Sequence, residues 1–205
     1  MMNAYPRWSF LAVPLLAALG CSDPVPPPAQ GAITLYVGSP TVPVNQMNCP
    51  VQSSTYQIAA TDSKTKLLAP PTATDPGESL ISGENGSTIS CSVKGSNGTF
   101  AFSGSMHGTT PQGDLISVTF TGGTINAADA DGNPTGTVNL TVYTPELSAN
   151  FVSPTATQCT VKVIDQQIKG GSMWAEFNCA QITSPPSGLC GVNASYIVFE
   201  NCSGS

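Results

Sequence analysis

Short runs in which apolar and polar residues alternate recur along this 205-residue chain. Such alternation is typical of strands with one face on a core and the other in water, as in antiparallel sheets. The runs pass through Leu35, Cys91, Phe102, Val118 and Leu140, and later ones span 158–164, 172–179 and 195–202. No stretch shows sustained helical periodicity. We therefore predict an all-β fold, an antiparallel β-sandwich of about nine or ten short strands.

Glycine-containing turns separate several of these runs. The Asn-Gly pair at 97–98 suits a two-residue hairpin turn that places Val93 opposite Phe102. The glycine pair at 122–123 predicts a second hairpin. The proline-containing stretch 61–83 has little pattern and predicts a long loop.

The N-terminal end has a different character. An uncharged apolar run from Trp8 to Gly20 follows the single basic residue Arg7. This run is too short for a membrane-spanning helix and is typical of a secretory signal peptide. The predicted organisation is a signal at 1–20, an anchor with a proline-rich tether at 21–31, and a β-sandwich domain at 32–205. A split of the last part into two subdomains near 145–154 is an alternative.

The junction Ala18-Leu19-Gly20-Cys21 resembles the lipobox of bacterial lipoproteins. In that family the signal is cut before the cysteine, which then carries lipid. The resemblance implies a mature protein that begins at Cys21 and is held by its acyl chains, palmitate among them, on a bacterial membrane. Ser22 resembles the residue that follows the anchor in lipoproteins of the outer membrane. We therefore expect an outer-membrane or cell-surface location.

Seven cysteines occur, and setting Cys21 aside leaves an even number in an exported chain. We expect three disulfides among them. The six residues are Cys49, Cys91, Cys159, Cys179, Cys190 and Cys202. Two strands symmetric about a glycine-containing turn favour the bridge Cys159–Cys179. Cys49–Cys91 and Cys190–Cys202 complete this set, and Cys179–Cys190 is an alternative bridge.

The charge balance argues against nucleic acid as a partner. After removal of the signal, five lysines and no arginine stand against twelve acidic residues, a net charge of −7. Binding to phosphates needs basic groups, preferably arginine. His107 is the only histidine, and neither a nucleophile-elbow motif nor a cofactor fingerprint is present. We assign no catalytic residue and expect no cofactor.

Calcium is the one metal that the sequence leaves open. Asp129, Asp131 and Asn133 resemble the first half of a calcium loop, but Leu140 stands where a bidentate acid is expected. A plain turn explains the same residues equally well, because aspartate, glycine and asparagine all tolerate turn conformations.

The run through Trp174 contains the best candidate for a binding site. Met173 belongs to the apolar face of its strand, so Trp174, Glu176 and Asn178 point the other way, beside Lys162 on the neighbouring strand. An exposed indole among hydrogen-bonding groups can stack on a sugar or anchor a protein. The alternative is that Trp174 is buried under a loop or a second sheet.

These observations favour a lipid-anchored, non-catalytic domain with a structural, adhesion or ligand-binding role, and a glycan or a surface protein as partner. The alternative is a hydrolase that acts on glycans or esters, with paired carboxylates drawn from Glu176, Glu200 and Asp165. The identity of the ligand and the oligomeric state stay open.

Overall fold

The computed structural model describes residues 25–40, 49–60, 71–96, 98–128, 134–186 and 188–204. These ranges contain eleven β-strands and two single-turn 3-10 helices, but no α-helix. The strands are β1 (Gln30–Gly38), β2 (Ser53–Ile58), β3 (Leu80–Ile81), β4 (Thr88–Ser96), β5 (Thr99–Thr109), β6 (Leu115–Ala128), β7 (Pro134–Tyr143), β8 (Phe151–Val152), β9 (Cys159–Lys169), β10 (Ser172–Ser184) and β11 (Gly188–Glu200). The predicted all-β class is confirmed.

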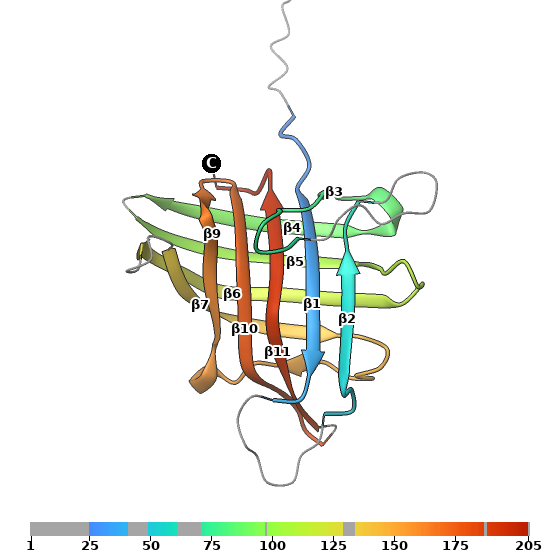
Figure 1. The fold of residues 1–205 in the computed structure, drawn as a ribbon. Helices are drawn as coiled ribbons and strands as arrows, with labels where there is room; N and C mark the ends of the chain where they lie inside the picture. Colours follow the sequence, from blue (N-terminus) through green and yellow to red (C-terminus); the bar gives the residue numbers. More distant parts are fainter. Residues whose placement is uncertain are drawn as a thin grey trace, which may run out of the picture.

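One antiparallel sheet contains all of these strands. Its order is β2-β1-β11-β10-β8-β7-β6-β5-β4, with β3 on β1 and β9 paired to both β10 and β7. The sheet folds over on itself, so β2, β1, β11, β10 and β9 form a front layer and β4 to β7 run across behind it (Figure 1). The result is a sandwich in which the strands of the two layers cross steeply.

The segment 145–154, where we considered a boundary between subdomains, lies within this sheet. In β8, Val152 pairs with Thr141 of β7 on one side and with Thr183 of β10 on the other. The same short strand therefore connects the back layer to the front layer.

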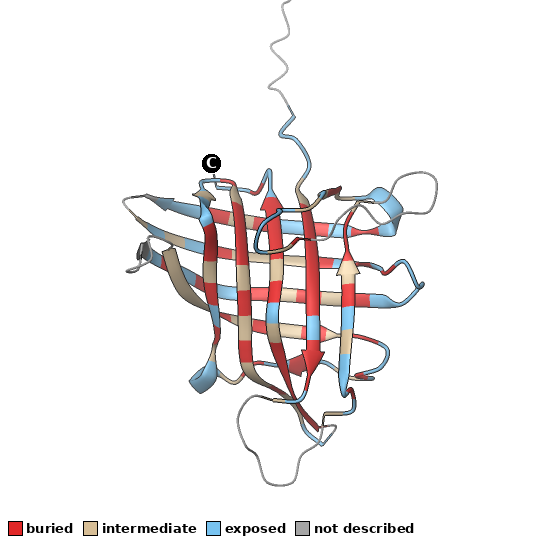
Figure 2. Cartoon of the chain, viewed as in Figure 1, coloured by how far each residue is buried: buried red, intermediate tan, exposed pale blue. Residues whose placement is uncertain are grey.

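The core lies between the two layers, where buried residues alternate along the strands (Figure 2). Phe120 of β6 meets Phe177 of β10 edge-on at 5.1 Å between ring centroids, and it meets Phe199 of β11 at 6.1 Å. Such aromatic pairs contribute about 0.5–1.5 kcal/mol beyond the burial of their area. A side chain at Gly104 would come within 2.6 Å of the Phe199 ring, so glycine is needed for this contact between layers.

The hairpin between β4 and β5 confirms the register predicted from the Asn-Gly pair. Val93 lies opposite Phe102, and Cys91 lies opposite Gly104. Val93 and Phe102 are both buried in the core. The alternation and the turn residues therefore specify the same pairing here.

The hairpin predicted at 122–123 is wrong, because β6 continues through both glycines. Gly122 has φ 62°, and the register of β6 shifts beside it. Phe120 and Ile125 are an odd number of residues apart, yet both are buried. The bulge adds one residue to the strand, so that both side chains face inward despite their odd spacing. The glycines therefore form a bulge within the strand and do not end it.

Three disulfides join the six cysteines of the domain, as predicted. Cys159–Cys179 links β9 to β10 and confirms the preferred bridge. The other two are Cys49–Cys190 and Cys91–Cys202, so the predicted Cys49–Cys91, Cys190–Cys202 and Cys179–Cys190 bridges are wrong.

The two unexpected bridges follow from the folding-over of the sheet. They join residues 141 and 111 positions apart. One ties the approach to β2 to the start of β11, and the other ties β4 of the back layer to the end of the chain. Closing loops of this length restricts the unfolded chain, an effect of about 4–5 kcal/mol for each bridge in the chain-entropy account.

The described chain begins in the proline-rich tether, where Val25 is 89% exposed. The tether leaves from the end of the domain where β1 begins (Figure 1). In the described ranges, no helix combines the length and the apolar character needed to cross a bilayer. The expected signal peptide and the lipid site Cys21 lie outside the described residues.

A carboxylate ties the edge strand β2 to the back layer. Glu146, just after β7, accepts hydrogen bonds from Tyr56 Oη at 2.7 Å and from Ser54 Oγ at 2.8 Å. Thr144 Oγ1 donates to Tyr56 Oη at 3.3 Å. The hydrogen bonds from Tyr56 and Ser54 hold the pKa of Glu146 below its ordinary 4.5, and burial together with Glu146 raises the pKa of Tyr56.

We expect Glu146→Gln to lower the free energy of unfolding near pH 7 by about 1 kcal/mol, as for a partly exposed, charge-assisted hydrogen bond. Because the native pKa of Glu146 is lowered, its contribution is present above pH 4.5 and is lost as the pH falls through the native pKa. The difference between the variant and the wild type is therefore expected to shrink at about pH 2.

Denaturant unfolding with the disulfides intact measures both values. Glu78→Gln is the matched control, because it removes an exposed carboxylate from the loop before β3. An equal loss at both pH values for Glu146→Gln, or the same loss for the control, contradicts the role of Glu146.

Candidate functional site

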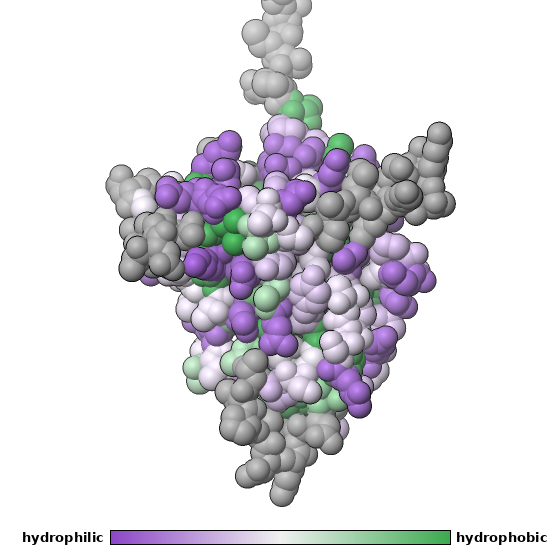
Figure 3. Space-filling view, viewed as in Figure 1, coloured by the Kyte–Doolittle hydropathy of each residue, from purple (hydrophilic) through white to green (hydrophobic). Residues whose placement is uncertain are grey.

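The outer face of the front layer carries a row of side chains in register across four strands. Thr34 of β1 lies opposite Tyr196 of β11, which lies opposite Glu176 of β10, which lies opposite Lys162 of β9. We call these four residues the outer row; Thr34 is fully buried, whereas Tyr196, Glu176 and Lys162 are partly exposed. Adjacent strands are ~4.8 Å apart, so the row is ~14 Å wide. Over the front strands this face is mostly pale in hydropathy, with purple side chains among the pale ones (Figure 3).

One end of the outer row borders a surface hollow of about 390 Å³. Lys162, Glu176 and Asn178 all line it, so three of the four residues predicted for a binding site come together. Thr160 and Thr135 also line it, from β9 and β7. The hollow therefore combines a cation, a carboxylate, an amide and hydroxyls, which can both donate and accept hydrogen bonds.

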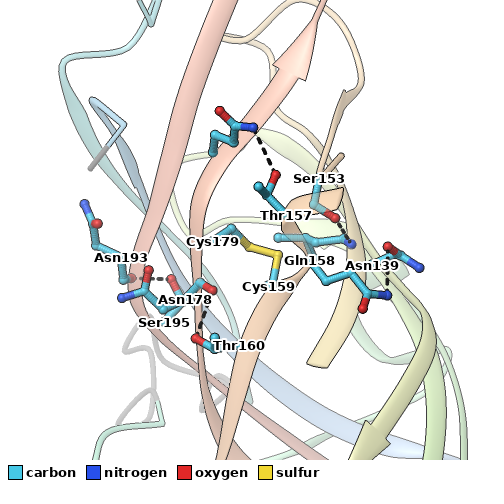
Figure 4. The surroundings of a disulfide bond; sticks show 12 residues. Asn139, Ser153, Thr157, Gln158, Cys159, Thr160, Asn178, Cys179, Asn193 and Ser195 are labelled. Atoms are coloured by element: carbon cyan, nitrogen blue, oxygen red, sulfur yellow. Dashed lines mark hydrogen bonds between the residues drawn. A yellow bond between two sulfur atoms is a disulfide. The ribbon is translucent and has the colours of Figure 1, made fainter. Parts of the chain in front are cut away.

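The confirmed disulfide lies next to this hollow. Cys159 and Cys179 are buried and point inward, while their neighbours Thr160 and Asn178 pair with each other across β9 and β10 (Figure 4). Thr160 Oγ1 donates to the backbone oxygen of Asn178 at 3.3 Å. The bridge thus holds β9, which carries Lys162, and β10, which carries Glu176 and Asn178, in one register below the hollow.

Two tyrosines extend the candidate surface at the other end of the outer row. Tyr36 is 37% exposed, and Tyr196 is half-buried. Burial raises the pKa of the Tyr196 hydroxyl, and Glu176 and then Tyr36 raise it further. Tyr196 lies opposite both Glu176 and Thr34, and Tyr36 is two residues from Thr34 on the same face of β1. The sequence analysis did not nominate the two tyrosines, although alternation with the buried Leu35 already directs Tyr36 outward.

Ser195 holds the backbone that presents Tyr36. The pairing of β1 with β11 shifts between Thr34 and Tyr36, which interrupts the regular ladder. There the backbone N–H of Tyr36 donates to Ser195 Oγ at 2.9 Å. Ser195 Oγ in turn donates to the backbone oxygen of Asn193 at 2.7 Å, as Figure 4 shows. A fully buried serine therefore satisfies the backbone at this bulge and fixes the strand beside the tyrosine.

Trp174 faces outward, as the alternation predicts, but the expected open platform is wrong. Its side chain is 8% exposed and packs with Ile164 and Val198 in a small cluster separate from the main core. Its Nε1 has no hydrogen-bond partner in the described part of the chain. Trp174 instead borders a neighbouring hollow of about 290 Å³ together with Pro76 and Glu200.

A bulge in β9 explains why Trp174 is covered. Met173 pairs with Ile168, but Ala175 pairs with Val163, so β9 has three more residues than β10 between these pairs. Asp165 and Gln166, inside this bulge, have φ values of 45° and 57°. The same bulge contains Ile164, which packs on the indole. Alternation predicts the direction of a side chain, but it does not predict a bulge on the neighbouring strand.

A larger hollow, of about 870 Å³, lies at the tether end of the domain. Its walls include Pro26 of the tether, the Cys91–Cys202 disulfide and the glycine-containing turn between β9 and β10. Lys169 and Glu200 are its charged residues. Polar side chains, among them Gln30, Asn201 and Ser203, also line it, but none of the four residues predicted for a binding site does.

The carboxylates considered for a hydrolase do not converge. Glu176 and Glu200 line different hollows, and Asp165 lines neither of these. Glu176 pairs with Tyr196, so Glu200 lies four residues farther along β11, or ~13 Å by strand geometry. Glycosidases place their two carboxyl groups ~5–9.5 Å apart.

The remaining catalytic and metal candidates find little support. His107 is exposed near the end of β5, between Thr88 and Ser117 of the adjacent strands. Among the described residues, no three His, Cys, Asp or Glu side chains form a group that could hold a metal ion. The calcium candidates Asp129, Asp131 and Asn133 lie outside the described residues.

Comparisons with known protein families, with curated proteins and with solved structures found no match for this chain. The functional argument therefore rests on the chemistry and geometry of the outer row and its flanking side chains.

Proposed function

We propose that this chain is a lipid-anchored, non-catalytic binding domain outside the cytoplasm of a bacterium, and that it holds its ligand on the outer face of the front layer. The observation that carries the proposal is the joining of two features in one row. Lys162, Glu176 and Asn178 line a polar hollow at one end, and Tyr36 and Tyr196 add aromatic surface at the other.

The inner face of the same layer supports a binding role over a purely structural one. Phe177 and Phe199 are used in packing against the back layer, so β10 and β11 are fixed by their inward residues. The outward residues Glu176 and Tyr196 are not part of this core. A rigid strand scaffold that presents polar and aromatic groups is suited to recognition.

The proposed anchor leaves room for a ligand. If the proline-rich tether from Cys21 to Gln30 is extended, it spans ~30 Å. The Thr34–Tyr196 pair lies four residues farther along β1, or ~13 Å. A lipid on Cys21 would therefore hold the outer row well clear of the membrane surface.

The first prediction concerns the anchor. We expect full-length protein expressed in a diderm bacterium to enter the detergent phase of a phase-separation extraction, because each buried acyl CH₂ contributes ~0.8 kcal/mol to membrane attachment. Cys21→Ala is expected to move the protein to the aqueous phase. Mass spectrometry of the mature N-terminus measures the attached lipid directly.

Val25→Ala is the matched control, because it changes the tether but leaves the junction intact. Wild-type protein that stays wholly in the aqueous phase, or an unmodified Cys21 in the mature chain, contradicts the anchor.

The second prediction concerns the binding face. A photo-crosslinking aromatic residue, p-benzoylphenylalanine, placed at Tyr36 is expected to form covalent adducts on intact cells, because Tyr36 is exposed on the outer face of the front layer. The adducts are measured as mass-shifted forms of the protein on a denaturing gel after irradiation.

The same photo-crosslinker at Tyr143 is the matched control. Tyr143 lies opposite Ser117 on the back layer, next to the buried Val142, and is therefore on the other outer face. Adducts at neither position, or equal adducts at both, contradict the proposed binding face.

A further inference from the structure

We propose that the ligand held by the outer row is a neutral oligosaccharide, which lies across β1, β11, β10 and β9. The inference rests on the proposed function and specifies the chemical class of the ligand.

The charge at the row favours a neutral ligand. Lys162 and Glu176 lie opposite each other, so the row itself carries one cation and one anion. The charged residue that lines the neighbouring hollow beside Trp174 is Glu200, another acid. The mature chain has a net charge of −7 and no arginine, so it lacks the bidentate cation that phosphates and sulfates favour. An anionic polymer would therefore be repelled by the protein as a whole.

The two tyrosines provide the surface for the apolar face of a sugar ring. Tyr196 lies opposite Thr34, two residues before Tyr36 on the same face of β1, and Tyr36 is 37% exposed. An aromatic ring with a polar tip can contact the C–H groups of a pyranose while it keeps its hydroxyl in water. The tyrosines thus take the place that the sequence analysis gave to Trp174.

The hollow provides hydrogen bonds for sugar hydroxyls. A hydroxyl both donates and accepts, and it therefore needs both kinds of partner. Glu176 accepts, Lys162 donates, and the Asn178 amide does both. All three line the hollow of about 390 Å³ together with exposed Thr160. Small, closely spaced polar groups of this kind suit a ligand with many hydroxyls.

The spacing favours more than one sugar ring. Tyr36 on β1 and Lys162 on β9 are three strand spacings apart, ~14 Å, with Tyr196 on β11 between them, and this stretch is longer than a single pyranose. A ligand that contacts both ends is therefore an oligosaccharide, and a monosaccharide is expected to bind weakly.

Binding of the full-length protein to immobilised neutral polysaccharides tests the proposal. The probes are dextran, mannan and laminarin, with alginate as the anionic comparison. The detergent used for purification has no sugar headgroup, because such a headgroup would compete for the site. We expect saturable binding to at least one neutral polymer, little binding to alginate, and competition by its oligosaccharide at lower concentration than by its monosaccharide.

Substitutions then locate the binding. Tyr36→Ala is expected to raise the Kd at least tenfold, on the scale of an aromatic anchor. Tyr36→Phe is expected to stay within about twofold, because the stacking ring is retained. Tyr143→Ala on the other outer face is expected to bind like the wild type. Unchanged thermal midpoints for Tyr36→Ala show that the domain is still folded.

Three results would each overturn the proposal that the ligand is a neutral oligosaccharide. They are binding to none of the neutral polymers, stronger binding to alginate than to these polymers, and unchanged binding by Tyr36→Ala. The photo-crosslinker at Tyr36 separates this failure from failure of the proposed function. If adducts form on cells but no polysaccharide binds, the proposed binding face stands and its ligand is of another class. If neither adducts nor polysaccharide binding are observed, the proposed binding face is itself wrong.

Discussion

The packing of Phe120 between Phe177 and Phe199 is the contact on which the rest of the structure depends. These rings join the back layer to two adjacent strands of the front layer, and all three are fully buried. Because side chains in a strand alternate, fixing Phe177 and Phe199 inward also fixes their neighbours outward. The placement of Glu176 is therefore a consequence of the core.

Two bulges determine which parts of the outward face are open and which are covered. At Ser195 a bulge with its own hydrogen bonds keeps Tyr36 presented. In β9 a larger bulge brings Ile164 onto Trp174 and closes that part of the face. One sheet thus has an open aromatic surface beside a covered one, although both follow the same alternation.

Much of the fold was predictable from sequence because it depends on local pattern. Alternation and an Asn-Gly turn predicted the Val93–Phe102 pairing, and strand symmetry predicted Cys159–Cys179. The same logic brought Lys162, Glu176 and Asn178 to one face, where they share a hollow. These predictions needed only neighbouring strands.

The failures involve contacts that local pattern does not contain. Cys49–Cys190 and Cys91–Cys202 depend on how the whole sheet folds over, since they join segments more than a hundred residues apart. The glycine pair at 122–123 looks like a turn, but the odd spacing of two buried side chains makes it a bulge. Trp174 is covered because of a bulge in the neighbouring strand β9, and the sequence of β10 alone does not predict that bulge.

Hydroxyl-radical footprinting of the purified, full-length protein tests the central claim that the open aromatic surface is at Tyr36 and not at Trp174. The chain has two tryptophans, Trp8 and Trp174, and peptide mapping by mass spectrometry measures the oxidation of Trp174 separately. The account predicts rapid oxidation of Tyr36 and slow oxidation of Trp174 and of buried Tyr56, although an indole is intrinsically more reactive than a phenol. Rapid oxidation of Trp174, together with protection of Tyr36 equal to that of Tyr56, would contradict it.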